Sequence, residues 1–421
     1  MNKMYLLSVV LWVLVFQISR CSNSTGILPG EDDSAGVIEI ENKGDLFYWL
    51  IRSRDKNAEA PLVIWLNGGP GSSSLFGLFD EIGPYLMKEG ELIYNQYAWN
   101  NNTDVLYIDQ PVGVGFSSQK NLHFSFAEKG VAENFHIFLT KFYSIYPEYR
   151  TRSLYIAGES FGGHYIPAIA AYLEEVTPSF PLKGLLIGNG WVNPKLQYPS
   201  YETFALQNHL LKKGWKSWII RKGFDVCEYL LEKEVFWPIP FLECSVFQYL
   251  ISGMPWNLHF NQYDIREECD NPPLCEGSEN YLGKFLNRDQ IRNKLHVEGR
   301  EWKSMNYWVF VTLLNDWVNS YQDDVAALLE KGLDIQFFNG DMDFICNWVG
   351  GEAWAENMQW SGRDMLLHQE RKLWLIEGEP YADYRKVKNF QLTKVFNAGH
   401  MVPSHSPMFA LEMLNDFIFK E

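Results

Sequence analysis

The residues Leu154-Tyr155-Ile156-Ala157-Gly158-Glu159-Ser160-Phe161-Gly162 join a short apolar run to the pattern Gly-x-Ser-x-Gly. The run 154–157 predicts a buried strand, and the stretch 166–176 predicts a helix behind the pattern. A serine placed between a strand and a helix in this way sits on a sharp turn, which projects its hydroxyl above the edge of a sheet. Such a turn needs tiny residues two positions before and two positions after the serine, because the backbone passes close to its neighbours there. We interpret Ser160 as a nucleophile; an ordinary glycine turn is the alternative interpretation.

Apolar runs of the same kind recur on both sides of this motif. Helix-like stretches such as 127–146 separate them, and an opening hairpin precedes them. Alternating strands and helices predict an α/β-hydrolase fold, with a mostly parallel central sheet and helices on both faces. The hairpin strands are expected at 37–40 and 46–51, and the buried strands at 62–66, 105–108, 154–157, 182–187, 335–338 and 392–396.

The segment 194–293 breaks this rhythm, since it has no buried-strand run and is rich in aromatic residues. It holds four cysteines, whose spacing leaves their pairing open and does not match a zinc site: Cys227, Cys244, Cys269 and Cys275. We predict a mostly helical, disulfide-stapled lid inserted between two parts of the core, 22–193 and 294–421. An independent second domain is the alternative.

The N-terminus is typical of a signal peptide at 1–21. Lys3 precedes an apolar run that ends before Arg20, and at about 15 residues this run is short for a membrane span, which needs roughly 20. A signal anchor is the alternative. Sequons at Asn23 and Asn101 predict glycosylation and agree with a secretory-pathway protein. No later apolar run is long enough to cross a bilayer, so we expect no membrane association after signal removal.

Net charge and cysteine content limit the classes of function and the compartments that fit this chain. The 36 Lys and Arg against 52 Asp and Glu give a net charge of −16, which argues against nucleic-acid binding. Cysteine usage agrees with an oxidising compartment, and Cys346 is left over as a free thiol.

A serine nucleophile needs a base, and the base needs an orienting acid; in this fold they follow the serine on loops after later strands. His400 is the expected base and either Asp343 or Asp341 the acid, while His164 and His405 are interpreted as structural or surface residues. The oxyanion hole is expected from the N–H of Phe161 and from the glycine-rich loop 67–71. That loop could also cradle a phosphate, but no lysine follows it in P-loop register.

Several of these segments together resemble the serine carboxypeptidase family (peptidase family S10), over about Asp45 to the C-terminus. The matching motifs are 65–71 (WLNGGPG), 107–117 (YIDQPVGVGFS), 158–163 (GESFGG), 340–348 (GDMDFICNW) and 398–403 (AGHMVP). The resemblance implies a set of roles for individual residues. It implies the triad Ser160, Asp343 and His400, the oxyanion-hole donors Gly69 and Phe161, and the substrate-carboxylate ligands Asn67, Glu81 and Glu159.

The implied activity is release of single C-terminal amino acids through an acyl-enzyme on Ser160. Two acidic residues can hold a third carboxylate only if at least one is protonated, so we expect activity to be favoured at acidic pH. Met401 would form an apolar wall and Cys346 a thiol near the site. The implied partners are peptide or protein C-termini, with no cofactor, metal or nucleic acid, in a lysosome or vacuole or outside the cell. A homodimer, an acyltransferase and a non-catalytic protective or chaperone-like protein stay open as alternatives.

Two positions depart from the family pattern. Phe161 stands where tyrosine is common, which matters little because only its backbone N–H is needed. Ser72 stands where many members have a cysteine bridged to the region of Ser304 and Met305, and both halves of that bridge are missing. We therefore expect the loop that carries Asn67 and Gly69 to be less firmly held.

Overall fold

A computed structural model describes residues 26–121, 123–269, 275 and 278–419 of the chain. The predicted signal peptide at 1–21 and the sequon at Asn23 lie outside the described residues. Among the residues described, no helix combines the length and the apolar content that spanning a bilayer requires.

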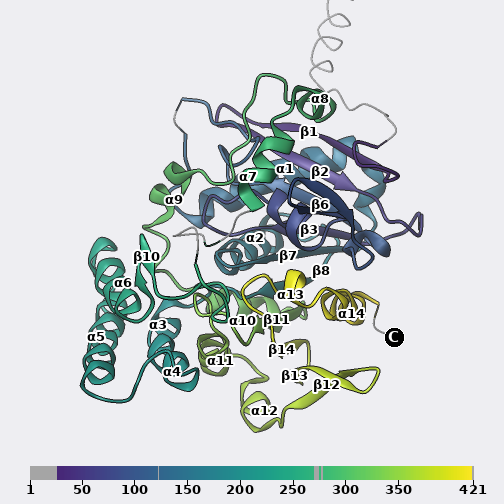
Figure 1. Cartoon of the computed structure of the whole chain (residues 1–421). Coiled ribbons are helices and arrows are strands. Elements are labelled where there is room, and N and C mark those ends of the chain that lie inside the picture. Colours follow the sequence, from purple (N-terminus) through teal and green to yellow (C-terminus); the bar gives the residue numbers. More distant parts are fainter. Residues whose placement is uncertain (1–25, 122, 270–274, 276–277, 420–421) are drawn as a thin grey trace, which may run out of the picture.

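A ten-stranded sheet in the order β1-β2-β6-β3-β7-β8-β11-β14-β13-β12 forms the centre of the molecule (Figure 1). The strands from β6 to β14 in this order are parallel, and both edges are antiparallel. This confirms the predicted fold class and each predicted strand. The strands are β1 (Asp33–Ile40), β2 (Gly44–Ile51), β3 (Leu62–Leu66), β6 (Asp104–Asp109), β7 (Leu154–Glu159), β8 (Leu182–Gly188), β11 (Asp334–Gly340), β12 (Lys372–Ile376), β13 (Glu379–Val387) and β14 (Phe390–Val395).

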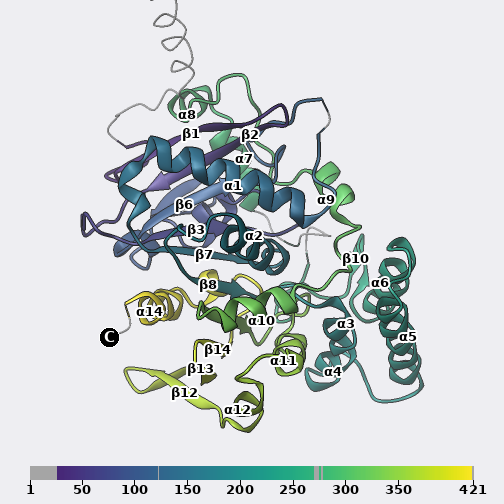
Figure 2. The ribbon, with the colours of Figure 1, turned by 180° about the vertical axis from the view of Figure 1, so that it is seen from behind.

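The central strands are continuously apolar because both faces of the sheet are buried. Along β3, Leu62, Ile64 and Leu66 pack into one hydrophobic cluster, while Val63 and Trp65 pack into the other. Helices cover both faces (Figure 2). They include η2 (Gly77–Glu81), α1 (Glu128–Ile145), α2 (Gly162–Val176), α10 (Gln322–Glu330), α11 (Trp348–Asn357), α12 (Arg363–His368), α13 (Val402–His405) and α14 (Pro407–Ile418).

The segment 194–293 enters between β8 and β11 and is mostly helical. Its disulfides join Cys227 to Cys244 and Cys269 to Cys275, which settles the pairing that spacing left open, and Cys346 is free and buried. Its helix α7 (Ser278–Leu286) packs against β4 (Tyr85–Lys88), far from α5 (Trp215–Glu232) (Figure 1). The elements are α3 (Pro194–Gln197), α4 (Ser200–Gln207), α5 (Trp215–Glu232), α6 (Pro238–Ser252), β9 (Gly253–Met254), β10 (Asn257–Leu258), α7 (Ser278–Leu286) and α8 (Asp289–Lys294). Smaller elements elsewhere are β4 (Tyr85–Lys88), β5 (Glu91–Tyr94), η3 (Trp99–Asn101), η4 (Pro147–Arg150) and α9 (Tyr307–Leu313).

Candidate active site

Ser160 occupies a strained turn between β7 and α2. Its φ of +60° lies in the left-handed region, which non-glycine residues rarely adopt. Three backbone hydrogen bonds hold the turn: Ser160 N–H donates to the Gly188 carbonyl at 3.1 Å, and the Ser160 carbonyl accepts from Gly163 N at 2.9 Å and Trp191 N at 2.8 Å. The packed loops after β8 therefore fix the direction in which the hydroxyl points.

The sequence predicted that the residues two positions before and two positions after Ser160 must both be tiny. The structure requires a tiny residue at only one of these two positions. A Cβ at Gly158 would lie 2.0 Å from the Leu66 carbonyl oxygen, so glycine is required before the serine. A Cβ at Gly162 would meet its nearest neighbour at 3.4 Å, which is an ordinary contact, so the expectation of a tiny residue there is wrong. The close approach occurs one residue later, where a Cβ at Gly163 would lie 2.6 Å from the backbone of Trp191.

His400 and Asp343 form a buried pair on the loops after β14 and β11. His400 Nδ1 donates to Asp343 Oδ2 at 2.8 Å. The same carboxylate accepts from Asn189 Nδ2 at 2.6 Å and from the N–H groups of Ile345 at 2.9 Å and Cys346 at 3.2 Å. These donors hold the carboxylate in one orientation toward the imidazole.

Asp341, the other candidate acid, instead faces the N–H of Ala398 at 3.4 Å. Asn189 was missed by the sequence analysis. Asn189 directly follows β8, which lies next to β11 in the sheet. Its position at the carboxyl end of a parallel strand could therefore have identified it as a candidate site residue.

The sequence analysis also missed the role of residues 262–265, which cross both the loop that carries Asp343 and the loop that carries His400. We call these four residues the clamp. The Tyr263 carbonyl accepts from His400 N–H at 2.7 Å, and the Gln262 carbonyl accepts from the N–H groups of Phe344 and Ile345, each at 3.1 Å. The Ile265 N–H donates to the Met342 carbonyl at 3.0 Å. The insertion therefore positions the acid loop and the base loop relative to each other.

The glycine-rich loop 67–71 lies against the serine turn. A Cβ at Gly68 would approach Phe161 N to 2.4 Å, and Gly69 has a φ of +106°, so both positions require glycine. Ser72 pairs with Met305 in an isolated antiparallel bridge. Around this bridge, Ser73 N–H donates to the Ser304 carbonyl and Asn306 N–H to the Gly71 carbonyl, both at 2.9 Å. Main-chain hydrogen bonds thus hold the loop where the family pattern has a disulfide.

Asn67, Glu81 and Glu159 meet at one end of the site. Asn67 Oδ1 accepts from Trp65 Nε1 at 2.8 Å and from Gly77 N at 3.0 Å. These two donors orient the amide, so its nitrogen faces Glu159 Oε1 at 3.0 Å and Glu81 Oε1 at 3.3 Å. Burial raises the pKa of Glu81 to about 7. A proton can therefore stay on Glu81 at mildly acidic pH.

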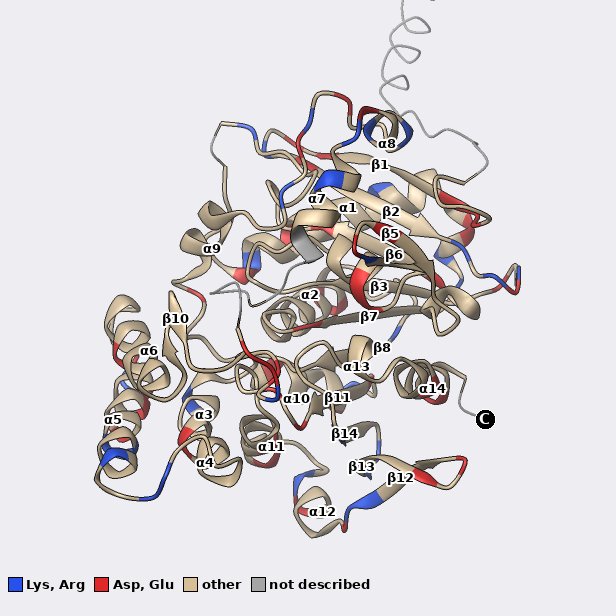
Figure 3. Cartoon of the chain, in the orientation of Figure 1, with Lys and Arg blue, Asp and Glu red and all other residues tan. Residues whose placement is uncertain are grey.

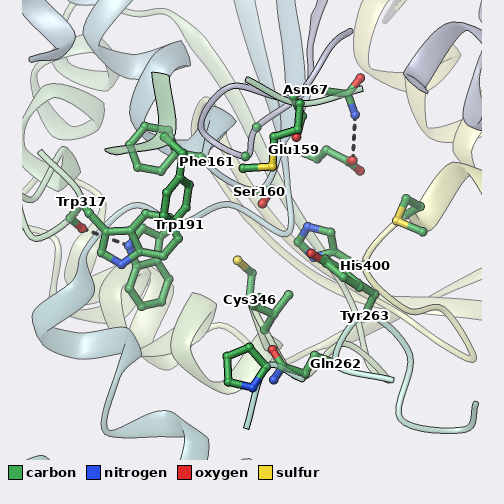
Figure 4. Close-up of a pocket in the computed structure, with 18 of the residues that line it drawn as sticks. Asn67, Glu159, Ser160, Phe161, Trp191, Gln262, Tyr263, Trp317, Cys346 and His400 are labelled. Atoms are coloured by element: carbon green, nitrogen blue, oxygen red, sulfur yellow. Dashed lines mark hydrogen bonds between the residues drawn. The ribbon is translucent and has the colours of Figure 1, made fainter. Parts of the chain in front are cut away.

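These groups border one cavity of about 350 Å³. Figure 4 shows Ser160, Cys346 and His400 turned toward the same part of it, with Asn67 bonded to Glu159 nearby. Asp343 lies behind His400, outside the lining, and burial raises the pKa of the Cys346 thiol well above its ordinary value. The lining includes Asn67, Gly69, Glu81, Glu159, Ser160, Phe161, Cys346, His400 and Met401, and an aromatic wall of Trp191, Tyr198, Tyr201, Phe241, Tyr249 and Trp317.

The remaining sequence candidates lie elsewhere. Asn101 donates through its side-chain nitrogen to the Gln96 carbonyl at 2.8 Å and is partly buried. His164 is buried and bonded to the Trp191 carbonyl. In the described part of the chain, one group of side chains has metal-ligand spacing: Asp264, Glu267 and His405. Within this group, Asp264 pairs with Arg266.

The chain resembles known proteins over nearly its whole length. A family model described as serine carboxypeptidase matches residues 28–420. Carboxypeptidase Y from Komagataella phaffii is 34% identical over 403 residues, covering 91% of this chain and 75% of that protein. Serine carboxypeptidase 3 from Oryza sativa subsp. japonica is 33% identical over 398 residues, covering 91% of this chain and 78% of that protein. The crystal structure of a prohormone-processing carboxypeptidase from Saccharomyces cerevisiae superposes with a TM-score of 0.82 at 26% identity, covering 92% and 91%.

Proposed function

Because this chain belongs to the serine carboxypeptidase family and is a serine-type carboxypeptidase, we propose a mechanism in which Ser160 forms an acyl-enzyme and single C-terminal residues are released. The observation that supports it best is the hydrogen bond of 2.8 Å between His400 and the buried Asp343, beside a cavity that Ser160 also lines. This arrangement provides a nucleophile, a base and an orienting acid.

The reaction proceeds in two acyl transfers. Ser160 Oγ attacks the last peptide carbonyl while His400 Nε2 takes the hydroxyl proton, and the developing oxyanion accepts hydrogen bonds from the N–H groups of Phe161 and Gly69. The C–N bond then breaks, His400 returns the proton to the leaving amine, and the C-terminal amino acid departs. Water, deprotonated by His400, then attacks the ester carbonyl. The bond from that carbon to Ser160 Oγ breaks, His400 returns the proton to Oγ, and the shortened peptide leaves with a new C-terminal carboxylate. Asp343 holds the imidazole and stabilises its charged form.

The C-terminal carboxylate of the substrate binds at Asn67, Glu81 and Glu159. Support comes from the orientation of the Asn67 amide, which is fixed by Trp65 and Gly77. It comes also from the raised pKa of Glu81, since a protonated carboxyl donates a hydrogen bond to the substrate carboxylate instead of repelling it. Peptide release is then strongest below neutral pH.

The test is release of the C-terminal residue from blocked dipeptides across an acid-to-neutral pH series, with Ser160→Ala beside the wild type. Release by the wild type alone, strongest in acid, supports the mechanism. If no dipeptide is cleaved while an organophosphonate still labels Ser160, the serine is a reactive nucleophile but peptide hydrolysis is not its reaction. Transfer of acyl groups to alcohols then replaces peptide hydrolysis as the proposal.

The same proposal includes the setting of the enzyme. We assign it to the secretory pathway, with removal of 1–21, glycosylation at Asn101 and a destination in a lysosome or vacuole or outside the cell. The segment 194–293 acts as the lid of the site. Support for this comes from the signal-like N-terminus, the two disulfides and the contacts of residues 262–265 with both catalytic loops.

A further inference from the structure

Asp109 is a buried carboxyl group at the carboxyl end of β6, and the proposed mechanism does not use it. The charged residues of the chain lie mainly on the loops and helices around the sheet, and β3 beside β6 carries none (Figure 3). Burial raises the pKa of the Asp109 carboxyl to about 7. A carboxyl group in such a place costs free energy unless hydrogen-bond donors stabilise it, so its partners indicate its role.

The sheet places Asp109 beside the glycine-rich loop of the active site. The strands β6 and β3 are parallel neighbours, and Trp65 pairs with Tyr107. Two residues further along each strand, Asp109 is level with Asn67, where the glycine-rich loop begins. The carboxyl ends of parallel strands meet at one edge of a sheet, so Asp109 lies on the same edge as the loop that it adjoins.

The Asp109 carboxyl group accepts hydrogen bonds from two segments of the chain. Its Oδ1 accepts from Ser73 Oγ at 2.5 Å and from Ser74 N at 3.1 Å, on the segment that continues the glycine-rich loop. Its Oδ2 accepts from Phe116 N at 2.9 Å. A Cβ at Gly115 would lie 1.9 Å from Oδ2, so glycine lets this second segment approach. The carboxyl group therefore joins the two segments.

The direction of the Ser73 hydroxyl is set by its other neighbours. The oxygen accepts from Trp302 Nε1 at 2.9 Å and from Leu75 N at 3.2 Å. A hydroxyl accepts through two lone pairs and has one proton to donate, so the proton of Ser73 goes to Asp109. Without an acceptor at Asp109, this hydroxyl and two N–H groups would lose a buried partner, which costs free energy.

The segment that Asp109 holds belongs to the loop with one of the proposed oxyanion-hole donors. The N–H of Asn67 donates to Ser74 Oγ at 3.2 Å, which closes residues 67–74 into one loop. Gly69 lies inside this loop, with a φ of +106° and its Cβ position 2.7 Å from Ser72 N, so it moves with the loop. An oxyanion-hole donor works only at hydrogen-bond distance from the reacting oxygen, so a small shift of the loop lowers the rate.

We propose that Asp109 is a positioning residue for the oxyanion hole, which keeps the N–H of Gly69 in place through the loop that it anchors. This inference rests on the proposed acyl-enzyme mechanism and adds a residue to it. The KM should depend little on Asp109, because the Asn67 amide that faces the substrate carboxylate is oriented by Trp65 and Gly77 instead.

The test is the kcat and KM for a blocked dipeptide, per folded molecule of the mature full-length enzyme. Deleting an oxyanion-hole donor costs roughly 10²–10³ in kcat, so Asp109→Ala, which removes the acceptor of all three hydrogen bonds, should cost about a hundredfold. Ser73→Ala keeps the Ser74 contact and should cost about tenfold. The KM should stay nearly unchanged in both. The double variant should lose no more than Asp109→Ala, because both substitutions remove the same support.

Asp104→Ala is the matched control. Asp104 is buried at the opposite end of β6 and accepts from Ser53 N at 2.7 Å and from the Tyr149 hydroxyl. It lies about 16 Å from Asp109, since a strand rises roughly 3.3 Å per residue. Its replacement should lower the melting temperature as Asp109→Ala does, and leave the kcat per folded molecule near the wild-type value.

A peptide aldehyde gives a second readout, which a purely structural role would not change. Ser160 Oγ bonds to the aldehyde carbon, His400 takes the hydroxyl proton, and the negatively charged oxygen then occupies the oxyanion hole. The inhibition constant of the aldehyde should therefore rise in Ser73→Ala by about the factor by which kcat falls. It should stay unchanged in Asp104→Ala.

Two results would overturn the inference. One is a wild-type kcat and inhibition constant in Ser73→Ala and Asp109→Ala. The other is an equal loss of kcat in Asp104→Ala, because general destabilisation then accounts for it. If Asp109→Ala does not fold, Ser73→Ala alone decides between these results. Failure of the proposed function is distinguishable: the wild type then releases no C-terminal residue from any peptide, and the inference falls with it.

Discussion

Replacing Glu81 by glutamine should remove the loss of substrate binding that we predict for the wild type above neutral pH. Glu81 is 2% exposed and shares the Asn67 amide with Glu159. Burial raises its pKa to about 7. Below that pH the carboxyl is protonated and, in the proposed binding mode, donates to the substrate carboxylate. Above that pH the ionised form would repel the substrate carboxylate.

The size of the effect follows from the proton population. Around a pKa of about 7, the protonated fraction falls from about half at pH 7 to about a tenth at pH 8, and each further unit costs another factor of ten, or 1.36 kcal/mol. The KM of the wild type for a peptide with a free C-terminus should therefore rise about fivefold between pH 7 and pH 8. The amide of Glu81→Gln donates at every pH, so its KM should stay flat over this interval. Glu159→Gln should also keep activity at neutral pH.

The assay is the KM for a blocked dipeptide, measured from acid to mildly alkaline pH for the wild type and both glutamine variants. The matched control is the same substrate with its C-terminal carboxyl converted to an amide, which carries no charge to be repelled. Our reasoning fails if the KM of the Glu81→Gln variant rises in parallel with the wild type. It fails equally if the amide substrate shows the same rise, because another group then controls binding.

Three further predictions address the scaffold of the site. Gly158→Ala should abolish folding or activity, because the added Cβ would lie 2.0 Å from the Leu66 carbonyl oxygen. Gly162→Ala should retain most activity. Soluble yield and kcat, measured for both variants, check this difference. The Asp264 carboxylate accepts from Arg266 N–H at 3.0 Å and lies 3.4 Å from His405 Nε2, so Asp264→Asn should loosen residues 262–265, which contact the His400 loop. The kcat should then fall severalfold with little change in KM, and an equal change in both would contradict this. Ser72→Cys combined with Met305→Cys should form the bridge that this chain lacks and add about 2–4 kcal/mol of stability; an unchanged melting temperature after oxidation would show that main-chain bonds already suffice.

The sequence predicted the parts of the site that depend on local patterns. A buried parallel strand reads as a continuous apolar run, and polar residues directly after such strands gather at one edge of the sheet. Ser160, Asp343 and His400 each follow a strand of this kind, so their loops could be located without the structure. The choice of Asp343 over Asp341 came from the family motif, and the structure pairs Asp343 with His400 at 2.8 Å.

The parts that were missed depend on tertiary contacts more than on a local pattern. The strand β12 contains the apolar run 373–376, which the sequence analysis did not assign to a strand, and in the structure its side chains are exposed or half-buried at the edge of the sheet. Gly162 was assigned a packing role by its place in a motif, but the close approach depends on where the loop with Trp191 passes, which is a tertiary fact. Asn189 had a signal, its position after β8, but an asparagine in a loop is common and nothing local connected it to Asp343.

The clamp of residues 262–265 explains why the lid had no recognisable catalytic motif. Its contacts with the catalytic loops use the carbonyl oxygens of Gln262 and Tyr263 and the N–H of Ile265, which every non-proline residue also has. These four contacts therefore depend on the backbone path of residues 262–265, which holds the geometry between Asp343 and His400 without a side-chain motif. Each such bond contributes about 1 kcal/mol net, so four bonds hold the loops with about 4 kcal/mol. Removing the lid would then misplace the base as well as uncover the cavity.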